Sequence, residues 1–332
     1  MADHAFTTTV IGAYPKIGDD LSLQTLRRAL HEFDRGAIGQ DALDAEFDRG
    51  TERAVREIDG AGVDVPNHGC LRWDDLFSPF VRVWRNVSRE ALERWFDNNT
   101  YFRIPVVTGP IEATGAATLQ ELAVARSATR KRVKGAIAGP FTFAHLAEDR
   151  HYRSLSALTL AAATALRSEL EALAAAGCAL VDVEEPALAR WPEDFANGRA
   201  RRVYEVLAGG VRTQVAIHLS MFPADAVAEH LAELPVAQIG IDVRSRPTRA
   251  LERIELAGQT LVLGAVDARN TKLETAEEIA RLVDAAARRV DPSRIWIAPT
   301  TSLEYLPHDI VRAKLRVLVE GARIALAAGG AR

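Results

Sequence analysis

The amino-acid sequence predicts an α/β protein whose parallel strands close into a (β/α)8 TIM barrel. Short runs rich in β-branched residues alternate with Ala-, Leu-, Arg- and Glu-rich helical stretches, and from residue 179 onward this alternation is unbroken. No G-x-G-x-x-G follows the first strand, as it would in an open dinucleotide-binding sheet. Polar residues follow most of the strands, whereas an open sheet would concentrate them at its switch point.

Nine runs have the composition of strands, one more than the barrel needs: residues 7–12, 62–67, 103–108, 134–139, 179–184, 214–220, 238–242, 261–266 and 294–299. The run 103–108 is the odd one, because Pro105 inside it is typical of an edge or accessory strand. We therefore assign residues 97–132 to an excursion made of an accessory hairpin and a helix. Residues 17–60 are expected to form an N-terminal helical elaboration.

Four longer stretches between and after the strands are predicted helices: residues 155–176, 223–233, 276–290 and 309–326. The third begins with a capping-box pattern, in which Thr275 is followed three residues later by Glu278. No linker or low-complexity segment interrupts the chain, so we expect residues 1–332 to be one domain.

Composition narrows the class of protein. The chain has 332 residues, 48% of them hydrophobic, which is enough to bury a core without disulfides or a structural metal. The net charge of −4 and the even spread of Arg argue against nucleic-acid binding. No secretory signal is visible, and charged residues interrupt every apolar stretch before it reaches bilayer length. We expect a cytoplasmic protein whose partners are small-molecule substrates, not nucleic acids or membranes.

Active-site groups of a barrel come from the carboxyl ends of its strands and the loops that follow them. The residues at those ends include carboxylates, two His and one Cys: Ile11, Gly12, Ala13, His68, Cys70, Glu184, Glu185, His218, Ser220, Asp242, Asp267 and Thr301. His145, shortly after the strand 134–139, is a further candidate. So many reactive groups at one mouth exceed what packing requires and indicate an enzyme. By contrast, four His in charged surroundings are expected to be solvated: His31, His151, His230 and His308.

Several of these strand ends carry motifs of a known family. In order along the chain they are IGAYP, VDVPNHG, GPFTF, VEEPAL, H-x-S, VDARNTKLE and a final P-x-x-S-L. Together they resemble the catalytic barrel of the cobalamin-independent methionine synthase family, from Thr7 to about Leu326. The resemblance implies a methyltransferase of methionine biosynthesis. It would move a methyl group from a reduced-folate-like or other donor to a small acceptor.

The same resemblance implies a zinc site made of His, Cys, an acidic residue and a second Cys. These positions fall on His218, Ser220, Asp242 and Thr301, so both thiolate ligands are absent. His218 and Asp242 would be the only strong ligands of a residual site, and such a set is poor for zinc. We therefore expect no tightly bound zinc. The alternative is a weak or rearranged site that recruits Cys70 or His145.

The residues that would hold the amino group of homocysteine have also changed. Family members have a Glu where this chain has Cys70, and usually an Asp where it has Glu184. A buried ammonium group that loses one of its anionic partners is costly to desolvate, which argues against homocysteine as the acceptor.

Without zinc, activation of the acceptor would fall to general-base chemistry. We expect His218, oriented by Asp242 across the neighbouring strand, to act as the acid–base pair, with His145 as an additional catalytic candidate. Glu184 would orient the acceptor, and the backbone of Ile11, Gly12 and Ala13 would hold a substrate carboxylate, as that loop does in the family. The remaining substrate-binding candidates are His68, Cys70, Glu185, Asp267, Ser220 and Thr301.

Two other functions stay open. A lyase or alkyltransferase that acts on a carbon–sulfur or other activated carbon bond would also use a His, Asp and Glu cluster. A non-catalytic binding protein could keep the barrel after losing the metal. An abandoned site, however, would lose His218 and Glu184 as readily as the Cys ligands.

Overall fold

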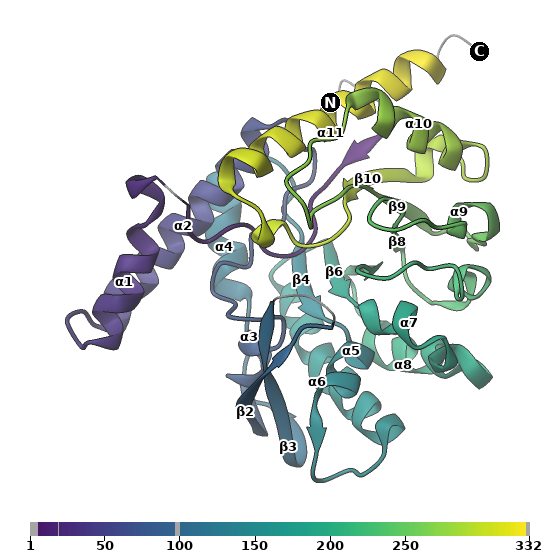
Figure 1. Ribbon diagram of the computed structural model, residues 1–332. Helices are drawn as coiled ribbons and strands as arrows, with labels where there is room; N and C mark the ends of the chain where they lie inside the picture. Colours follow the sequence, from purple (N-terminus) through teal and green to yellow (C-terminus); the bar gives the residue numbers. More distant parts are fainter. Residues whose placement is uncertain (1–5, 19, 97–99, 330–332) are drawn as a thin grey trace.

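A computed structural model describes residues 6–18, 20–96 and 100–329 of the chain. Within these residues, parallel strands form one curled sheet in the order β1-β10-β9-β8-β7-β6-β4, with helices on its outside (Figure 1). Its strands are β1 (Thr7–Thr8), β4 (Gly135–Ala138), β6 (Leu180–Glu184), β7 (Gln214–Leu219), β8 (Gln238–Asp242), β9 (Thr260–Val266) and β10 (Ile295–Pro299). The α/β class and the parallel sheet predicted from the sequence are therefore confirmed.

The predicted strand 62–67 lies between the two edge strands, β1 and β4. Val65 pairs with Thr9, and Asn67 pairs with Lys134, each as an isolated parallel bridge. The N–H of Val65 donates to the Thr8 carbonyl at 3.1 Å, and that of Lys134 donates to the Pro66 carbonyl at 3.0 Å. Pro66 has no N–H of its own, which shortens the ladder. The segment thus touches both edges without forming a regular strand.

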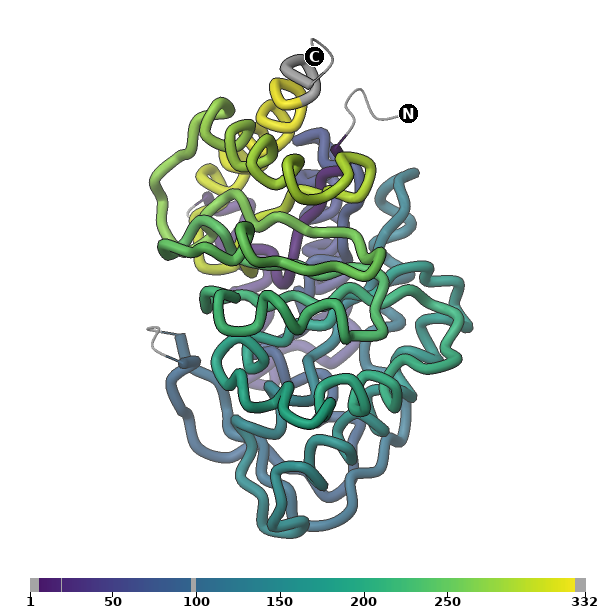
Figure 2. The backbone as a smooth tube through the Cα atoms, turned by 90° about the vertical axis from the view of Figure 1, so that its right-hand side faces the viewer, coloured from purple at the N-terminus to yellow at the C-terminus, as the bar shows by residue number. Residues whose placement is uncertain are grey.

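Helices connect successive strands, and Figure 2 shows the strand–helix units stacked one above another. The helices after β4 are α5 (Pro140–Leu146), α6 (Leu155–Ala175), α7 (Pro186–Arg190), α8 (Arg199–Ala208), α9 (Ala250–Arg253), α10 (Ala276–Ala287) and α11 (His308–Gly329). Five 3-10 turns are interspersed among the described residues: η1 (Leu21–Leu23), η2 (Pro192–Gly198), η3 (Ala228–Glu233), η4 (Pro292–Arg294) and η5 (Leu303–Tyr305).

Two predicted helices are shorter in the structure. The stretch 223–233 is helical only as η3, and ahead of it the carboxylate of Asp225 accepts the N–H of Arg249 and the hydroxyl of Thr248. Helix α10 ends at Ala287, three residues before the predicted end. Its predicted capping box, between Thr275 and Glu278, is present.

The N-terminal stretch 17–60 contains η1, α1 (Thr25–Asp34) and α2 (Gln40–Gly60); residue 19 within it lies outside the described residues. The pair α1 and α2 projects from one side of the molecule (Figure 1). Apolar side chains of Leu26, Ala29 and Leu43 form a small core between them, separate from the main one.

A second, smaller sheet has the order β2-β3-β5, built from β2 (Trp84–Arg94), β3 (Tyr101–Ala113) and β5 (Glu148–Asp149). The accessory run 103–108 lies in β3. The predicted start of the excursion at residue 97 is wrong, because β2 begins at Trp84; residues 97–99 themselves lie outside the described residues. Most side chains of β2 are exposed, so its sequence lacks the apolar alternation that marks a half-buried strand. Two helices flank the hairpin, α3 (Ser78–Val81) and α4 (Leu119–Ala128).

One apolar core runs from Phe6 to Ala325 and joins the outer face of the curled sheet to its helices. In the part of the chain that the structure describes, no helix is long and apolar enough to cross a membrane. Several buried polar residues lie on the strands of the curled sheet, among them Asp182, Glu184, His218 and Asp242.

Candidate active site

A cavity of about 180 Å³ lies at the carboxyl ends of the strands. Its wall combines residues that follow β1, β6, β7 and β10 with the loop before α3 and with the hairpin. Four of the residues expected from the sequence line it together: Ala13, Glu184, Ser220 and Thr301.

Glu184, the last residue of β6, is only 8% exposed. Burial, together with the charges of Glu304 and Asp182 and against the charge of Lys134, raises its pKa to about 8. Among the described residues, no hydrogen bond or ion pair engages its carboxylate. Gly12 allows the close approach, because a Cβ there would lie 3.1 Å from the Glu184 Oε1 atom.

The predicted backbone cradle at residues 11–13 is engaged in part with the loop after β10. The N–H of Ala13 donates to Ser302 Oγ at 2.9 Å, and the Ala13 carbonyl accepts from the Leu303 N–H at 3.0 Å. The Gly12 carbonyl accepts from Asn67 Nδ2 at 2.7 Å. Ile11 is buried in a small apolar cluster. These bonds hold the loop rigidly at the pocket and occupy the Ala13 N–H.

His218 does not line this pocket and lies instead in a buried charged network. Its Nε2 atom is 3.0 Å from Asp182 Oδ1, and Lys134 Nζ is 2.6 Å from Asp182 Oδ2. All three side chains are almost completely buried. Burial alone would raise the pKa of Asp182, but the charge of Lys134 and the contacts with Lys134 and His218 outweigh it and hold that pKa below its usual value. Burial lowers the pKa of Lys134 despite its acidic partner.

The predicted pairing of His218 with Asp242 is therefore wrong, because Asp182 on the other neighbouring strand occupies the position beside the imidazole. Asp242 faces the same small hollow as His218. Its Oδ1 atom, however, accepts the backbone N–H groups of Arg244 at 3.0 Å and Ser245 at 2.9 Å. Burial raises the pKa of Asp242, and its carboxylate stabilises the turn that follows β8.

His68 and Cys70 are completely buried and do not line the pocket. The N–H of Cys70 donates to His68 Nδ1 at 3.3 Å, and the Glu121 carboxylate lies 3.9 Å from the same nitrogen. Burial lowers the pKa of His68 and raises the pKa of the Cys70 thiol well above its usual value. The thiol is therefore held in its unreactive protonated form.

Glu185 faces away from the pocket and joins two helices. Its carboxylate accepts the N–H groups of Phe141 at 3.1 Å and Thr142 at 2.6 Å, and the Tyr204 hydroxyl at 3.1 Å. Burial raises its pKa to about 7 in spite of these donors. This arrangement ties the start of α5 to α8.

His145 and Asp267 also lie outside the pocket lining. The His145 ring stacks on Trp191 with centroids 3.9 Å apart, and its Nε2 atom is 2.7 Å from Asp194 Oδ2. Asp267 accepts the Arg269 N–H at 2.9 Å in the loop after β9. Both side chains are engaged with their own surroundings.

The side chains at the family's zinc positions do not fit zinc. The Nε2 atom of His218 faces Asp182, and Ser220 and Thr301 supply neutral hydroxyls where thiolates would be needed. Thr301 Oγ1 instead contacts Met221 Sδ at 3.9 Å. Within the described residues, no group of three or more His, Cys, Asp or Glu side chains is placed to hold a metal ion.

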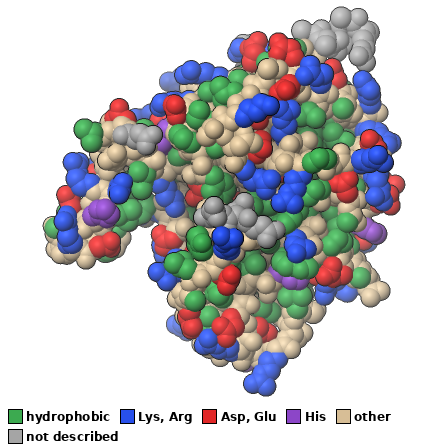
Figure 3. All heavy atoms as spheres, viewed as in Figure 1, with side chains coloured by type: hydrophobic (Ala, Val, Ile, Leu, Met, Phe, Trp, Pro, Cys, Tyr) green, Lys and Arg blue, Asp and Glu red, His purple; other side chains and the backbone are tan. Residues whose placement is uncertain are grey.

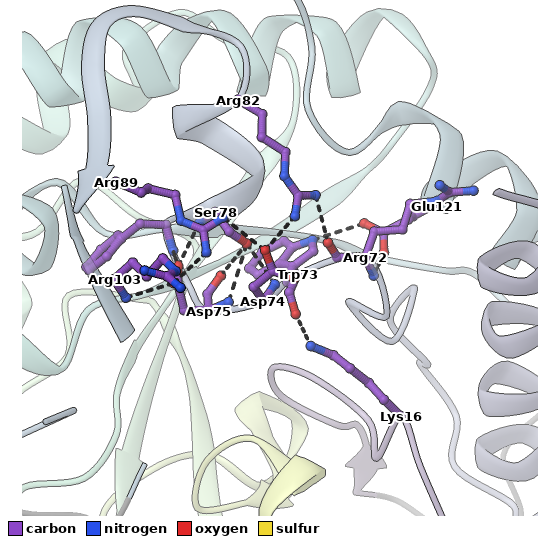
Figure 4. A network of polar contacts seen from close by, with 11 residues as sticks. Lys16, Arg72, Trp73, Asp74, Asp75, Ser78, Arg82, Arg89, Arg103 and Glu121 are labelled. Atoms are coloured by element: carbon purple, nitrogen blue, oxygen red, sulfur yellow. Dashed lines mark hydrogen bonds and ion pairs between the residues drawn. The ribbon is translucent and has the colours of Figure 1, made fainter. Parts of the chain in front are cut away.

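The loop before α3 is part of the pocket that the sequence did not reveal. Trp73, Asp74 and Asp75 line the cavity, and Figure 4 shows Arg82 and Arg89 pointing toward the two carboxylates. Arg82 lies 2.7 Å and Arg89 2.9 Å from Asp74 Oδ2. These contacts neutralise the two Asp and fix the hairpin to the pocket wall.

The same network is joined from the opposite side by Lys16, whose Nζ donates to the Trp73 carbonyl (Figure 4). The indole N–H of Trp73 donates to Glu121 Oε2 at 3.0 Å. None of these residues ends a strand, so the search of strand ends could not find them.

Glu304 and Tyr305 are two further lining residues that the sequence search missed. They follow directly on the P-T-T-S-L motif, so extending that motif by two residues would have included them. Burial raises the pKa of Glu304, although the charge of Lys16 lowers it in part. Lys134 is the only charged residue in the predicted strand 134–139, and its position there was visible in the sequence.

The distribution of charged side chains on the surface agrees with the even spread of Arg along the sequence. On the face shown in Figure 3, Lys and Arg side chains are interspersed with those of Asp and Glu. No continuous basic tract of the kind that follows a phosphate backbone is visible on that face.

Comparison with known proteins shows which family the chain belongs to. A family model described as the catalytic domain of cobalamin-independent synthase matches residues 6–324. The methionine synthase of Saccharolobus solfataricus is 29% identical over 320 residues, which cover 96% of this chain and 94% of that protein. That of Sulfolobus acidocaldarius is 27% identical over 319 residues, or 96% and 91%.

Among solved structures, the B12-independent methionine synthase from Shewanella sp. W3-18-1 in complex with selenomethionine shares the fold. Its TM-score is 0.85 at 21% identity, with 98% of this chain and 99% of that chain covered. The family resemblance predicted from the motifs is confirmed. This chain belongs to the cobalamin-independent methionine synthase family, whose catalytic domains are methyltransferases.

Proposed function

We propose that this protein transfers a methyl group from a reduced-folate-like donor, or another methyl carrier, to a small acceptor without the zinc–thiolate route of its family. The observation that carries the proposal is the composition of the pocket wall. Ala13 and Glu184 are in place, while Ser220 and Thr301 present hydroxyls at the positions of the thiolate ligands.

In this proposal Glu184 orients the acceptor and His218 moves its proton. The two residues are register partners on adjacent strands, β6 and β7, so their side chains are neighbours inside the sheet curl. Asp182 fixes the imidazole from the other side. The acceptor gives its proton to His218 and its lone pair to the methyl carbon, and the donor atom that loses the methyl group takes up a proton.

Aromatic side chains in the cavity wall suit a flat donor. Trp95, Tyr101 and Tyr305 all line it and offer ring faces or edges for stacking. Glu184 and Ser220 lie at strand ends in the same wall, where a small acceptor would be held.

We also propose that residues 62–67 act as the eighth strand and close the curled sheet into a (β/α)8 barrel in a single domain. The support is the pair of bridges that Val65 and Asn67 form with the two edge strands. Closure would explain why the polar strand ends meet around one cavity.

The decisive test measures metal content and methyl transfer on the same preparation. Because the relatives are named methionine synthases, homocysteine with a methylated reduced folate is the first substrate pair to assay. We expect far less than one zinc per chain, and any turnover observed should survive chelation. His218→Ala should lower kcat by roughly a hundredfold or more but leave ligand binding intact. The control is His151→Ala, at an exposed position.

Stoichiometric zinc together with methionine formation that chelators abolish would contradict the proposal. A wild-type protein that binds ligands but turns over no methyl donor would point to the binding-protein alternative.

A further inference from the structure

The pocket is lined by four carboxylates, and no Lys, Arg or His belongs to its described lining. Asp74 and Asp75 are paired with Arg89, and Asp74 also with Arg82, so these two carry little uncompensated charge. Glu184 and Glu304 differ from them. In the described part of the chain, neither forms an ion pair.

The two Glu side chains line one cavity, where the charge of Glu304 acts on Glu184 and the charge of Lys16 partly offsets that of Glu304. Glu184 is only 8% exposed, and the charge of Glu304 adds to the burial that raises its pKa. The Ser302 hydroxyl donates to Glu304 Oε1 at 3.3 Å. Two carboxylates in one desolvated cavity repel each other, and a cation placed between them removes that repulsion and supplies the missing partner.

The same cavity offers little to an anion. The Ala13 N–H donates to Ser302, and Lys16 donates to the Trp73 carbonyl. What is left on the strand-end side is mainly the neutral hydroxyls of Ser220 and Thr301. A substrate carboxylate would lose its hydration without gaining a charged partner.

We propose that Glu304 and Glu184 together bind a positively charged group of the acceptor, and that Glu304 makes the pocket prefer a net cation to a zwitterion or an anion. This rests on the proposed function, since it names the class of acceptor for the same pocket. The acceptor is therefore an ammonium compound whose carboxyl group is absent, blocked or dispensable.

Isothermal titration calorimetry with four thioethers of one skeleton tests this directly. Methioninol is a cation, methionine a zwitterion, 4-(methylthio)butanoate an anion and 4-(methylthio)butan-1-ol neutral. We expect methioninol to bind most tightly, then methionine, and the anion least. Glu304→Gln should weaken methioninol about tenfold or more and leave the neutral alcohol within about twofold. Glu304→Asp keeps the charge and should preserve the order.

The matched control is Glu112→Gln, an exposed carboxylate on the hairpin that does not line the pocket. It should leave all four affinities unchanged. Equal binding of the cation and the anion to the wild-type protein overturns the inference, whatever the variants do. So does a folded Glu304→Gln protein that binds methioninol as the wild type does. Because binding is measured without a methyl donor, preferential cation binding in a protein with no methyl transfer would refute the proposed function alone.

Discussion

At the scale of single residues, burial sets the protonation of the pocket. Burial at the end of β6 and, to a smaller extent, the charges of neighbouring carboxylates raise the pKa of Glu184 to about 8. In the unfolded chain the same group ionises near its ordinary value of 4.5. Between these two values the folded state keeps a proton that the unfolded state has released.

Because of its raised pKa, Glu184 makes the free energy of unfolding decrease as the pH rises. The contribution of Glu184 to stability is complete below about pH 4.5 and is lost as the pH rises toward 8, because the folded state must then bury a charge or take up a proton. We expect Glu184→Gln, which cannot ionise, to lose less stability than the wild type between pH 5.5 and pH 8.5. Urea unfolding at the two pH values measures this. An exposed control, Glu171→Gln, should show the wild-type slope, and an equal slope for Glu184→Gln would contradict the prediction.

Residue-level reasoning from the sequence found the ends of strands but could not choose among their neighbours. It named His218 and Glu184 correctly as residues at the strand ends, yet it paired His218 with Asp242, one strand away, instead of Asp182 on the other side. Both Asp residues are on strands next to that of His218, but at different heights along the sheet. Asp182 is level with the residue two positions before His218, whereas Asp242 lies two positions beyond the residue that pairs with His218. His308 was expected to be solvated, but it is buried with Tyr14 at a ring distance of 5.6 Å.

At the scale of elements, a helix start can be predicted from the sequence when all of its capping residues are present. The start of α10 combines an N-cap and its reciprocal partner: Glu278 donates its N–H to Thr275 Oγ1 at 3.2 Å, and the Thr275 N–H donates to Glu278 Oε2 at 3.2 Å. The pattern was visible in four consecutive residues. The hairpin strand β2 was missed because its exposed, charged side chains carry no apolar period.

Thr275→Ala should reduce the free energy of unfolding by about 1 kcal/mol, because it leaves the N–H of Glu278 without its cap. Chemical denaturation is the measurement. Thr164→Ala is the matched control, since that exposed hydroxyl donates only to the Leu160 carbonyl inside α6 and its loss should be neutral or slightly stabilising. A cost at Thr164 equal to that at Thr275 would show that capping is not the cause.

At the scale of the whole molecule, we expect stability to depend strongly on the connection between the two edges of the sheet. Asn67 donates to the Gly12 carbonyl at 2.7 Å and accepts the Gly69 N–H at 3.0 Å, and its backbone bridges to Lys134. It therefore joins the segments after β1 and before β4. Both partners are buried, so they would be left without water if the side chain were removed.

Asn67→Ala should destabilise the protein by about 2 kcal/mol and speed hydrogen exchange at both edges of the sheet. Asn270→Ala is the comparison, because this exposed side chain also makes two hydrogen bonds, to Asp267 and to the Lys272 N–H. Its loss should cost less than about 1 kcal/mol, since water replaces the partners. Equal costs would mean that residues 65–67 do not hold the edges together.

The order and type of the strand–helix units, the capping box and the positions of the reactive strand ends could all be read from the sequence, because each depends on residues close together in the chain. The family membership was likewise visible in short motifs. What lies inside the pocket could not be read in this way. Asp182 beside His218, Glu304 in the same cavity as Glu184, and the hairpin anchored on Asp74 and Asp75 bring together segments far apart in the sequence. The curl of the sheet brings them together, and the burial that follows sets their charges.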